Sequence, residues 1–370
     1  MATLSRRSLL RAAGGVAALP LGAHALFHPG GGAGQTAPAG APATRTLRRG
    51  VEAAPVITLT CADYVRFMPI ATGDVRPDGM TLHWIRGDRN EMLRRATQDP
   101  AVDGGESSLA QHVMRIAAGD RSLVAIPVFP LRNFTARDIY VAKGSTLTPQ
   151  TLNGRRLGIY NWAASGAVWY RHLVRYFGQD PAKISWVVGA ADPTATVNVV
   201  GTLPSHVTLA PKGRSLSDLL LANEIEAIFT PLPPAKYHVN DGPLSRLIPG
   251  YRRVEQNYYQ ETRCYPPQHA LVIRRAVWER QPAIGRRLVD AFQRGDEAYH
   301  ASQRLYPYGS PWLIEEIEQT ELAMSARYHA HGLEANRHAL DVFCEGAWRD
   351  GLTARRVTVD EMFAEFLAAA

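Results

Sequence analysis

The chain has 370 residues, of which 46% are hydrophobic and 20% charged, and its formal net charge at pH 7 is +7. Lysine and arginine (41 residues) only slightly outnumber aspartate and glutamate (34 residues) and are spread through the sequence, which suits a small anionic ligand better than a polyphosphate track. No zinc-finger, RNA-recognition or helix-turn-helix signature occurs, so nucleic-acid binding is not expected. The three cysteines, Cys61, Cys264 and Cys344, have no metal-ligand spacing; three free thiols are expected, with one disulfide as the alternative.

The N-terminus carries an export pattern. Arg6 and Arg7 precede an apolar, small-residue run over 12–21, which closes on the small-x-small triplet 23–25. This pattern predicts a twin-arginine signal peptide over residues 1–25, so the twin-arginine translocase is an expected partner and the periplasm the expected location. The run is shorter than the ~20 apolar residues that a membrane-spanning helix needs.

Residues 26–55 are rich in glycine, proline and alanine and hold few bulky apolar side chains. Such a segment cannot bury enough surface to offset its loss of conformational entropy, so a disordered tether is predicted here. The folded part is expected to begin near Val56. It is too long for one ordinary core and fits two lobes.

From Val56 onward, short apolar segments alternate with amphipathic ones. Strands are predicted at 56–60, 81–85, 123–128, 138–142, 156–160, 226–230 and 269–273. Helices are predicted at 91–95, 109–116 and 167–177, from Ser215 onward with Asp218 three residues later, and through the C-terminal part, where the last has a capping box of Thr358 and Glu361. The alternation predicts an α/β fold of two lobes, with two mixed sheets flanked by helices.

The chain is expected to leave one lobe, build the other and return. Lobe I is assigned to 56–142 and 269–370, and lobe II to 143–268, with a ligand cleft between the lobes. Clefts of this kind bind small ligands at strand carboxyl ends and helix N-termini, where backbone N–H groups and the helix dipole favour anions. Closure of the lobes around the ligand is the expected motion.

Four segments carry a resemblance to a known family. They are 58–64, 124–130 together with Arg132 and Phe134, 251–255 together with Tyr258 and Tyr259, and 267–275. In this order they resemble the 4,5-dihydroxyphthalate decarboxylase family over roughly Ile57 to Tyr299. The resemblance implies the type II periplasmic-binding-protein fold, shared with the substrate-binding proteins of ABC transporters, and decarboxylation of an aromatic dicarboxylate. The chain departs from the family in its export signal and in Leu232, which lies between prolines where relatives often have arginine.

An aromatic dicarboxylate needs cationic forks, and arginine matches a carboxylate bidentately. Arg66, in the first strand-end loop, and Arg132, in the loop before the crossover, are the candidates; an ordinary ion pair is the alternative for each. The segment 161–165, with Asn161 and Ser165, could offer backbone N–H groups and a hydroxyl to a second carboxylate, unless Ser165 is a plain helix cap. Side chains that could stack on the ring are Tyr64, Phe134 and Trp162. The remaining candidate contacts, at predicted strand ends and loops, are Asp63, Ser107, Ser108 and Thr230.

Loss of CO2 from a hydroxylated ring requires a proton at the carbon that bears the leaving carboxylate. His269 is the first candidate for this acid because it titrates near neutrality and lies where the chain re-enters lobe I; a hydrogen-bonded hinge histidine is the alternative. Glu106, in the segment 103–108, is the second, since burial could raise its pKa enough to hold a proton, although a mid-loop carboxylate is usually solvated. No motif demands a cofactor or a metal, although Asp63, Glu106 and His269 together could hold a divalent ion.

Two functions remain open at this point. As a carboxy-lyase, the protein would hold one carboxylate with arginine and direct the other away from positive charge. As an exported binding protein, it would hold the same ligand unchanged and deliver it to a membrane transporter. The family resemblance favours decarboxylation and the predicted location favours binding; we adopt the decarboxylase interpretation.

Overall fold

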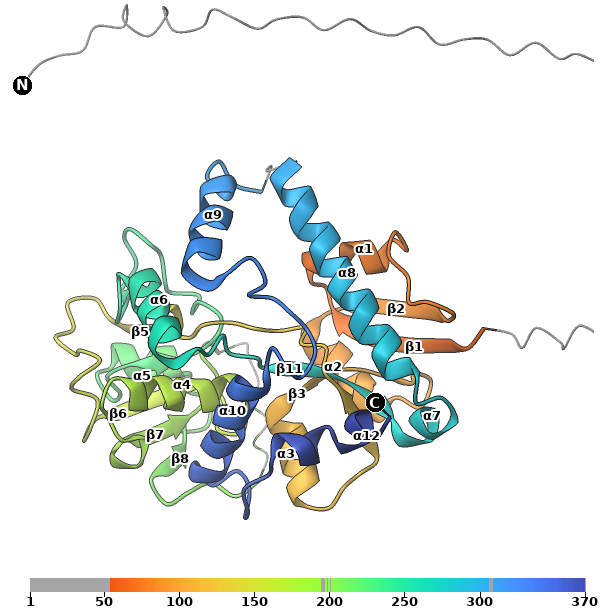
Figure 1. The fold of residues 1–370 in the computed structure, drawn as a ribbon. Helices are drawn as coiled ribbons and strands as arrows, with labels where there is room; N and C mark the ends of the chain where they lie inside the picture. Colours follow the sequence, from red (N-terminus) through yellow and green to blue (C-terminus); the bar gives the residue numbers. More distant parts are fainter. Residues whose placement is uncertain (1–53, 194–196, 198, 200, 306–308, 370) are drawn as a thin grey trace, which may run out of the picture. The chain divides into compact units, whose positions relative to one another are not determined.

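The computed structural model of the chain describes residues 54–193, 197, 199, 201–305 and 309–369. The predicted signal peptide, 1–25, and the predicted tether up to residue 53 lie outside this part. Strands and helices alternate along the described residues, and the strands form two sheets (Figure 1). Within the same residues, no helix combines the length and the apolar character that crossing a membrane would require.

The first sheet has the strand order β2-β1-β3-β11-β4. Its strands are β1 (Val56–Ala62), β2 (Thr81–Gly87), β3 (Gly104–Ser108), β4 (Leu123–Ile126) and β11 (His269–Arg274). β1 pairs in parallel with β2 and β3, whereas β11 runs antiparallel to its neighbours β3 and β4. The sheet is therefore mixed, and a strand from late in the chain lies inside it, beside β3.

The second sheet has the strand order β10-β5-β9-β6-β7-β8. Its strands are β5 (Ile139–Ala142), β6 (Arg156–Ile159), β7 (Ser185–Val188), β8 (Val207–Leu209), β9 (Ile228–Phe229) and β10 (Leu244–Arg246). β6 is parallel to β7 and β9, and β5 is antiparallel to β9 and β10. β5 was expected in lobe I, but it pairs with β9 and β10, which lie in the predicted lobe II, and so belongs to the second sheet. The lobe boundaries themselves stay a prediction.

The predicted helices are confirmed. The helices between the strands are α1 (Met68–Ala71), α2 (Arg89–Gln98), α3 (Leu109–Ala117), α4 (Ser165–Tyr176), α5 (Leu216–Leu221) and α6 (Tyr251–Thr262), of which α1 and α6 were not predicted. After β11 come α7 (Arg275–Arg280), α8 (Ile284–Leu305), α9 (Leu313–Met324), α10 (Arg337–Arg349), α11 (Val359–Met362) and α12 (Ala364–Ala368). Ser215 and Asp218 form a capping box at α5, and Thr358 and Glu361 form another at α11, as their spacing predicts.

The strand β3 was not predicted, because Gly104 and Gly105 are typical of a turn. Both glycines have a positive φ, 156° and 150°, and both are squeezed between neighbouring strands. A Cβ atom on Gly104 would lie 2.0 Å from the Val272 carbonyl oxygen. A Cβ atom on Gly105 would lie 2.2 Å from the Thr60 carbonyl oxygen. Only glycine fits this close approach, so the pair lets β3 run between β1 and β11 and brings the next residue, Glu106, into the middle of the sheet.

The elements around both sheets share one large hydrophobic cluster. It joins α3, β4, α4, β6 and α10 through buried side chains such as Val113, Ala125, Ile159, Val168 and Phe343. α10 packs against α4, and Figure 1 shows these two helices side by side. α11 and α12 contact α3 and β4 instead. The C-terminal helices therefore pack against elements that flank both sheets.

Candidate functional site

Glu106 lies at the centre of a buried hydrogen-bond network and is itself completely buried. Its Oε2 accepts the backbone N–H of Ala62 at 2.8 Å and the thiol of Cys61 at 3.3 Å. Its Oε1 accepts the hydroxyl of Tyr64 at 2.7 Å and the Nδ1–H of His269 at 2.5 Å. The four donors come from the end of β1, the loop that follows it and the first residue of β11. The network therefore ties three segments of the first sheet to one carboxylate.

These donors set the charge of Glu106. Burial raises the pKa of this carboxyl group, but the charge and hydrogen bond of His269, with the Ala62 N–H and the Tyr64 hydroxyl, outweigh burial and lower the pKa to about 2. The carboxylate is therefore ionised at neutral pH. The expectations that Glu106 lies in a loop and that burial could raise its pKa enough to hold a proton are wrong, because the sequence shows neither its place in β3 nor the donors that outweigh burial.

His269 is the first residue of β11, where it pairs in register with Ser108 of β3. Its side chain is 10% exposed, whereas that of Glu106 is 0% exposed. Because Nδ1 donates to Glu106, the other ring nitrogen, Nε2, is the atom that can exchange a proton with a ligand. A carboxylate behind a histidine fixes the orientation of the imidazole and stabilises its protonated form.

Tyr64 and Cys61 complete the contacts around the carboxylate. Burial raises the pKa of both groups, and the charge of Glu106 raises each further, so the phenol and the thiol stay protonated and act as donors. A thiol in this state is a poor nucleophile. All three cysteines, Cys61, Cys264 and Cys344, are buried and free, so the alternative of one disulfide is wrong.

Two of the predicted serines link β3 to α4. The hydroxyls of Ser108 and Ser165 are 2.8 Å apart, and Ser165 Oγ also accepts the N–H of Ala110 at 3.0 Å. Ser108 immediately precedes α3, and Ser165 is the first residue of α4, so this contact joins the N-terminal ends of two helices. Ser107 is buried between Ser108 and Glu106 along β3. The structure thus brings these predicted contacts to the strand that carries Glu106.

Two of the predicted stacking residues are held by other side chains. Trp162 is buried, and the guanidinium carbon of Arg171 lies 4.0 Å from its ring centroid. Phe134 packs against Tyr265, with the ring centroids 5.0 Å apart. Of the three predicted aromatic residues, all in the described part of the chain, only Tyr64 hydrogen-bonds to Glu106.

Three further candidates make local contacts. Asp63 is exposed and forms an ion pair of 2.9 Å with Arg86. Asn161 Oδ1 accepts the N–H of Ala163 at 2.9 Å, and Thr230 is buried just after β9. The described residues contain no group of three or more His, Cys, Asp or Glu side chains placed to hold a metal ion. Asp63 therefore does not join Glu106 and His269 in the divalent-ion site that the sequence left open.

Arg66 lies in a second buried polar cluster. Its guanidinium forms an ion pair with Asp296 of α8 and donates to the carbonyl oxygens of Phe129 at 2.6 Å and Pro130 at 2.7 Å. Asp296 is completely buried, and its Oδ2 lies 3.2 Å from Nε2 of His331. Arg66 thus makes the ion pair that the sequence analysis gave as the alternative to carboxylate binding.

Arg132 lies beside this cluster. Its Nη2 donates to the carbonyl oxygen of Ala330 at 2.7 Å, and its guanidinium carbon lies 5.0 Å from the ring centroid of Phe129. Burial, with the nearby charge of Arg66, lowers the pKa of Arg132 to about 10, so the side chain stays cationic at neutral pH. Its role as a carboxylate fork stays a prediction.

Arg89, the first residue of α2, was not among the residues predicted for the site. Its guanidinium carbon lies 5.9 Å from the ring centroid of Tyr64, next to the Glu106 network. A signal was present in the sequence, because Arg89 follows the predicted strand 81–85 at a helix start, where anionic ligands bind in α/β folds. The residue type alone gave no reason to prefer it over the many other arginines.

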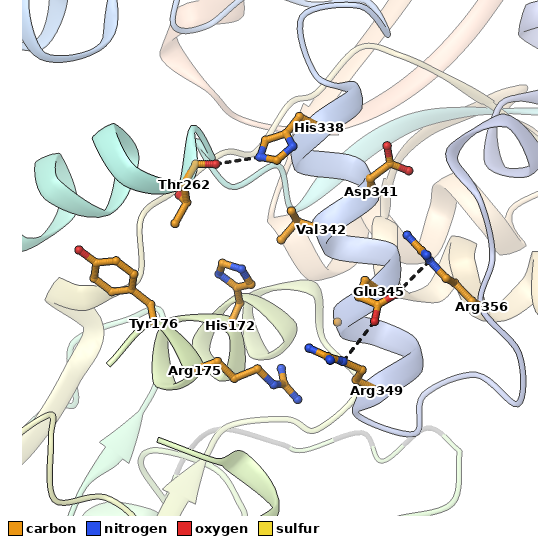
Figure 2. A pocket seen from close by; sticks show the side chains of 11 residues that line it. His172, Arg175, Tyr176, Thr262, His338, Asp341, Val342, Glu345, Arg349 and Arg356 are labelled. Carbon is orange, nitrogen blue, oxygen red and sulfur yellow. Dashed lines mark hydrogen bonds and ion pairs between the residues drawn. The ribbon is translucent and has the colours of Figure 1, made fainter. Parts of the chain in front are cut away.

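A pocket of about 690 Å³ opens between α4 and α10 (Figure 2). Within it, Glu345 pairs with Arg349 and with Arg356, each at 3.1 Å, so much of its local charge is already neutralised. Neither Glu106 nor His269 lines this pocket. The hydrogen-bond network, rather than this pocket, is therefore the candidate site.

The fold places the chain in a known class. Among solved structures, the chain is similar to the periplasmic aliphatic sulphonate binding protein SsuA from Escherichia coli, with a TM-score of 0.50 and 14% sequence identity over 83% of this chain and 91% of that chain. With its two mixed sheets flanked by helices, the chain has the periplasmic-binding-protein fold that the sequence predicted.

Two curated proteins give the more particular similarity. The chain is 28% identical over 317 residues to 4,5-dihydroxyphthalate decarboxylase from Comamonas testosteroni, covering 83% of this chain and 96% of that protein. It is 27% identical over 209 residues to the protein of the same name from Pseudomonas putida, covering 55% of this chain and 81% of that protein. No family model matches the chain. The predicted resemblance to 4,5-dihydroxyphthalate decarboxylases is confirmed.

Proposed function

We propose that this protein binds an aromatic carboxylate beside Glu106 and His269 and removes CO2 from it. The observation that carries the proposal is the 2.5 Å hydrogen bond between Glu106 Oε1 and His269 Nδ1, which joins an ionised, completely buried carboxylate to a histidine whose side chain is 10% exposed. Similarity to two proteins named 4,5-dihydroxyphthalate decarboxylase supports 4,5-dihydroxyphthalate or a close analogue as the substrate.

His269 is the proposed proton donor. The bond between the ring carbon and the leaving carboxylate breaks, its electron pair stays on the ring carbon, and the proton on Nε2 of His269 forms the new C–H bond. CO2 departs, and His269 regains a proton from water. Glu106 transfers no proton in this scheme; its charge stabilises the protonated imidazole, and its hydrogen bond fixes the orientation of the ring.

The donors around Glu106 have a defined part in this scheme. Burying a carboxylate is costly unless it is paired and hydrogen-bonded, and Ala62, Tyr64 and His269 together meet that requirement. Because these protein donors occupy the carboxylate oxygens, Glu106 interacts with the imidazole of His269 rather than with a ligand. Ser107, Ser108 and Ser165 are the proposed contacts for the polar groups of the substrate, because they lie where β3 meets α4.

We also propose that the protein is exported through the twin-arginine route to the periplasm. The support is the Arg6 and Arg7 pair ahead of a short apolar run. In that compartment the alternative function is to hold the same carboxylate unchanged and deliver it to a membrane transporter.

Incubation of the purified protein with 4,5-dihydroxyphthalate tests the proposal. We expect release of CO2 together with an equal amount of 3,4-dihydroxybenzoate, measured by gas analysis and chromatography. Tight binding without CO2 would contradict decarboxylation and favour the binding-protein alternative. Neither binding nor CO2 release would contradict both.

A further inference from the structure

Arg89 is a cation beside the proposed site. It is half-buried at the start of α2. Its guanidinium carbon lies 5.9 Å from the ring centroid of Tyr64, and the Tyr64 hydroxyl lies 2.7 Å from Glu106 Oε1. One tyrosine side chain therefore separates Arg89 from the network that holds His269.

Arg89 has no anionic partner among the described residues, a feature that it shares with Arg132. His269 pairs with Glu106, and Arg66 pairs with Asp296. Across the described ranges, Arg89 forms neither an ion pair nor a hydrogen bond, and its Nε is buried without a partner. A buried guanidinium nitrogen without an acceptor carries a desolvation cost that an anionic ligand would offset.

Tyr160 extends this environment to the second sheet. It follows β6, and a Cβ atom on Gly166, in the first turn of α4, would lie 2.7 Å from its hydroxyl and 3.2 Å from Gln268 Oε1. Gln268 directly precedes β11. Burial raises the pKa of both Tyr64 and Tyr160, and the charge of Arg89 opposes that rise in each. The charge of Arg89 therefore acts on a phenol that follows a strand of each sheet, Tyr64 after β1 and Tyr160 after β6.

We propose that Arg89 binds the carboxylate that the substrate retains after CO2 has left. The inference rests on the proposed function and assigns the substrate to aromatic compounds with a second anionic group. An arginine fork binds a carboxylate through two parallel N–H···O hydrogen bonds. The leaving carboxylate must lose its charge to depart as CO2, so a cation bound to it would stabilise the ground state and slow the reaction. The guanidinium of Arg89 therefore binds the retained carboxylate, while His269 protonates the ring carbon.

Ligand titration of Arg89→Gln tests the inference, with Arg94→Gln as the matched control. Arg94 is exposed on the same helix, and its replacement changes the net charge equally. Because a charge-assisted pair is lost, Arg89→Gln should bind 4,5-dihydroxyphthalate and 3,4-dihydroxybenzoate at least about 30-fold more weakly, and catechol, which has no carboxylate, within about threefold of wild type. Arg94→Gln should match wild type with all three ligands.

Kinetics supply a second readout. The KM of Arg89→Gln for 4,5-dihydroxyphthalate should rise more than its kcat falls, and Arg89→Lys should recover part of the affinity because it restores the charge without the fork. Dicarboxylate binding by Arg89→Gln within threefold of wild type would overturn the inference. If wild type binds the dicarboxylate but releases no CO2, decarboxylation fails and the titration still decides the role of Arg89. If wild type binds no carboxylate, both proposals are overturned.

Discussion

His269 Nδ1 lies 2.5 Å from Glu106 Oε1 although 163 residues separate the two along the chain. The antiparallel pairing of β11 with β3 sets His269 opposite Ser108 and Leu271 opposite Glu106. His269 and Glu106 are therefore diagonal neighbours on one face of the sheet, within reach of each other's side chains. The carboxylate has no access to solvent and the imidazole has some, which is the arrangement that delivery of a proton to a ligand requires.

Replacing His269 with asparagine separates proton donation from ligand binding. His269→Asn should lower the rate of CO2 release from 4,5-dihydroxyphthalate by about 10²-fold or more, because the general acid is lost, and should change ligand affinity little. Steady-state kinetics and titration calorimetry measure the two effects. His83→Asn, an exposed position on β2 of the same sheet, should behave as wild type. Equal turnover by His269→Asn and wild type would show that another group donates the proton.

Glu106→Gln should alter the pH dependence of stability. The pKa of Glu106 is about 2 in the folded protein, below the value of about 4.3 in an unfolded chain. A lowered folded-state pKa contributes stability that is fully present above pH ~4.3 and is lost as the pH falls toward 2. The variant should therefore be about 3 kcal/mol less stable than wild type at pH 7, and this difference should shrink below pH ~4. Urea unfolding across this range measures it; a difference that stays constant would contradict an ionised Glu106.

Because neighbouring backbone lies so close to β3, adding a single methyl group at Gly105 should lower the free energy of unfolding substantially. Gly105→Ala should destabilise the protein by about 3 kcal/mol or more, since its Cβ would lie 2.2 Å from the Thr60 carbonyl oxygen. Gly144→Ala is the control, because φ is +84° there but nothing lies within 4 Å of the added atom, so only the backbone cost of about 1 kcal/mol is expected. Thermal unfolding of the two variants measures the contrast, and similar losses would show that β3 has room to move.

The export proposal depends on the two arginines themselves rather than on their charge. Conversion of Arg6 and Arg7 to lysine should leave full-length precursor in the cytoplasm, because the twin-arginine route recognises the arginine pair. Arg11→Lys makes the same chemical change outside the pair and should export normally. Immunoblots of cell fractions give the result, and an unchanged periplasmic yield of the double variant would refute the route.

Many of the strands and helices could be predicted from the sequence, because their signals are local, although short strands such as β7, β8 and β10 were not. Apolar runs located strands such as β1 and β11, and the capping boxes at Ser215 and Thr358 were recognisable because their partners lie three residues away. The order of the four motifs along the chain identified the similarity to 4,5-dihydroxyphthalate decarboxylases. That similarity in turn predicted the periplasmic-binding-protein fold.

The pairing of the strands and the role of Gly104 and Gly105 depend on contacts between segments that are distant in the sequence. Ile139–Ala142 was recognised as a strand, yet its sheet was fixed by β9 and β10, which come much later in the chain. Gly104 and Gly105 are typical of a turn in a local pattern. They form part of a central strand because neighbouring backbones approach so closely that no side chain fits.

The same contrast holds for the candidate site. Residue types pointed to His269, Glu106 and Tyr64, but only the pairing of β3 with β1 and with β11 joined them into one network and reversed the expected pKa shift of Glu106. The sequence could not show that Arg66 has an anionic partner and that Arg89 has none within the part of the chain that the structure describes. Burial and neighbouring charges fix the protonation and the partner of an ionisable group, and both depend on segments that are distant in the sequence.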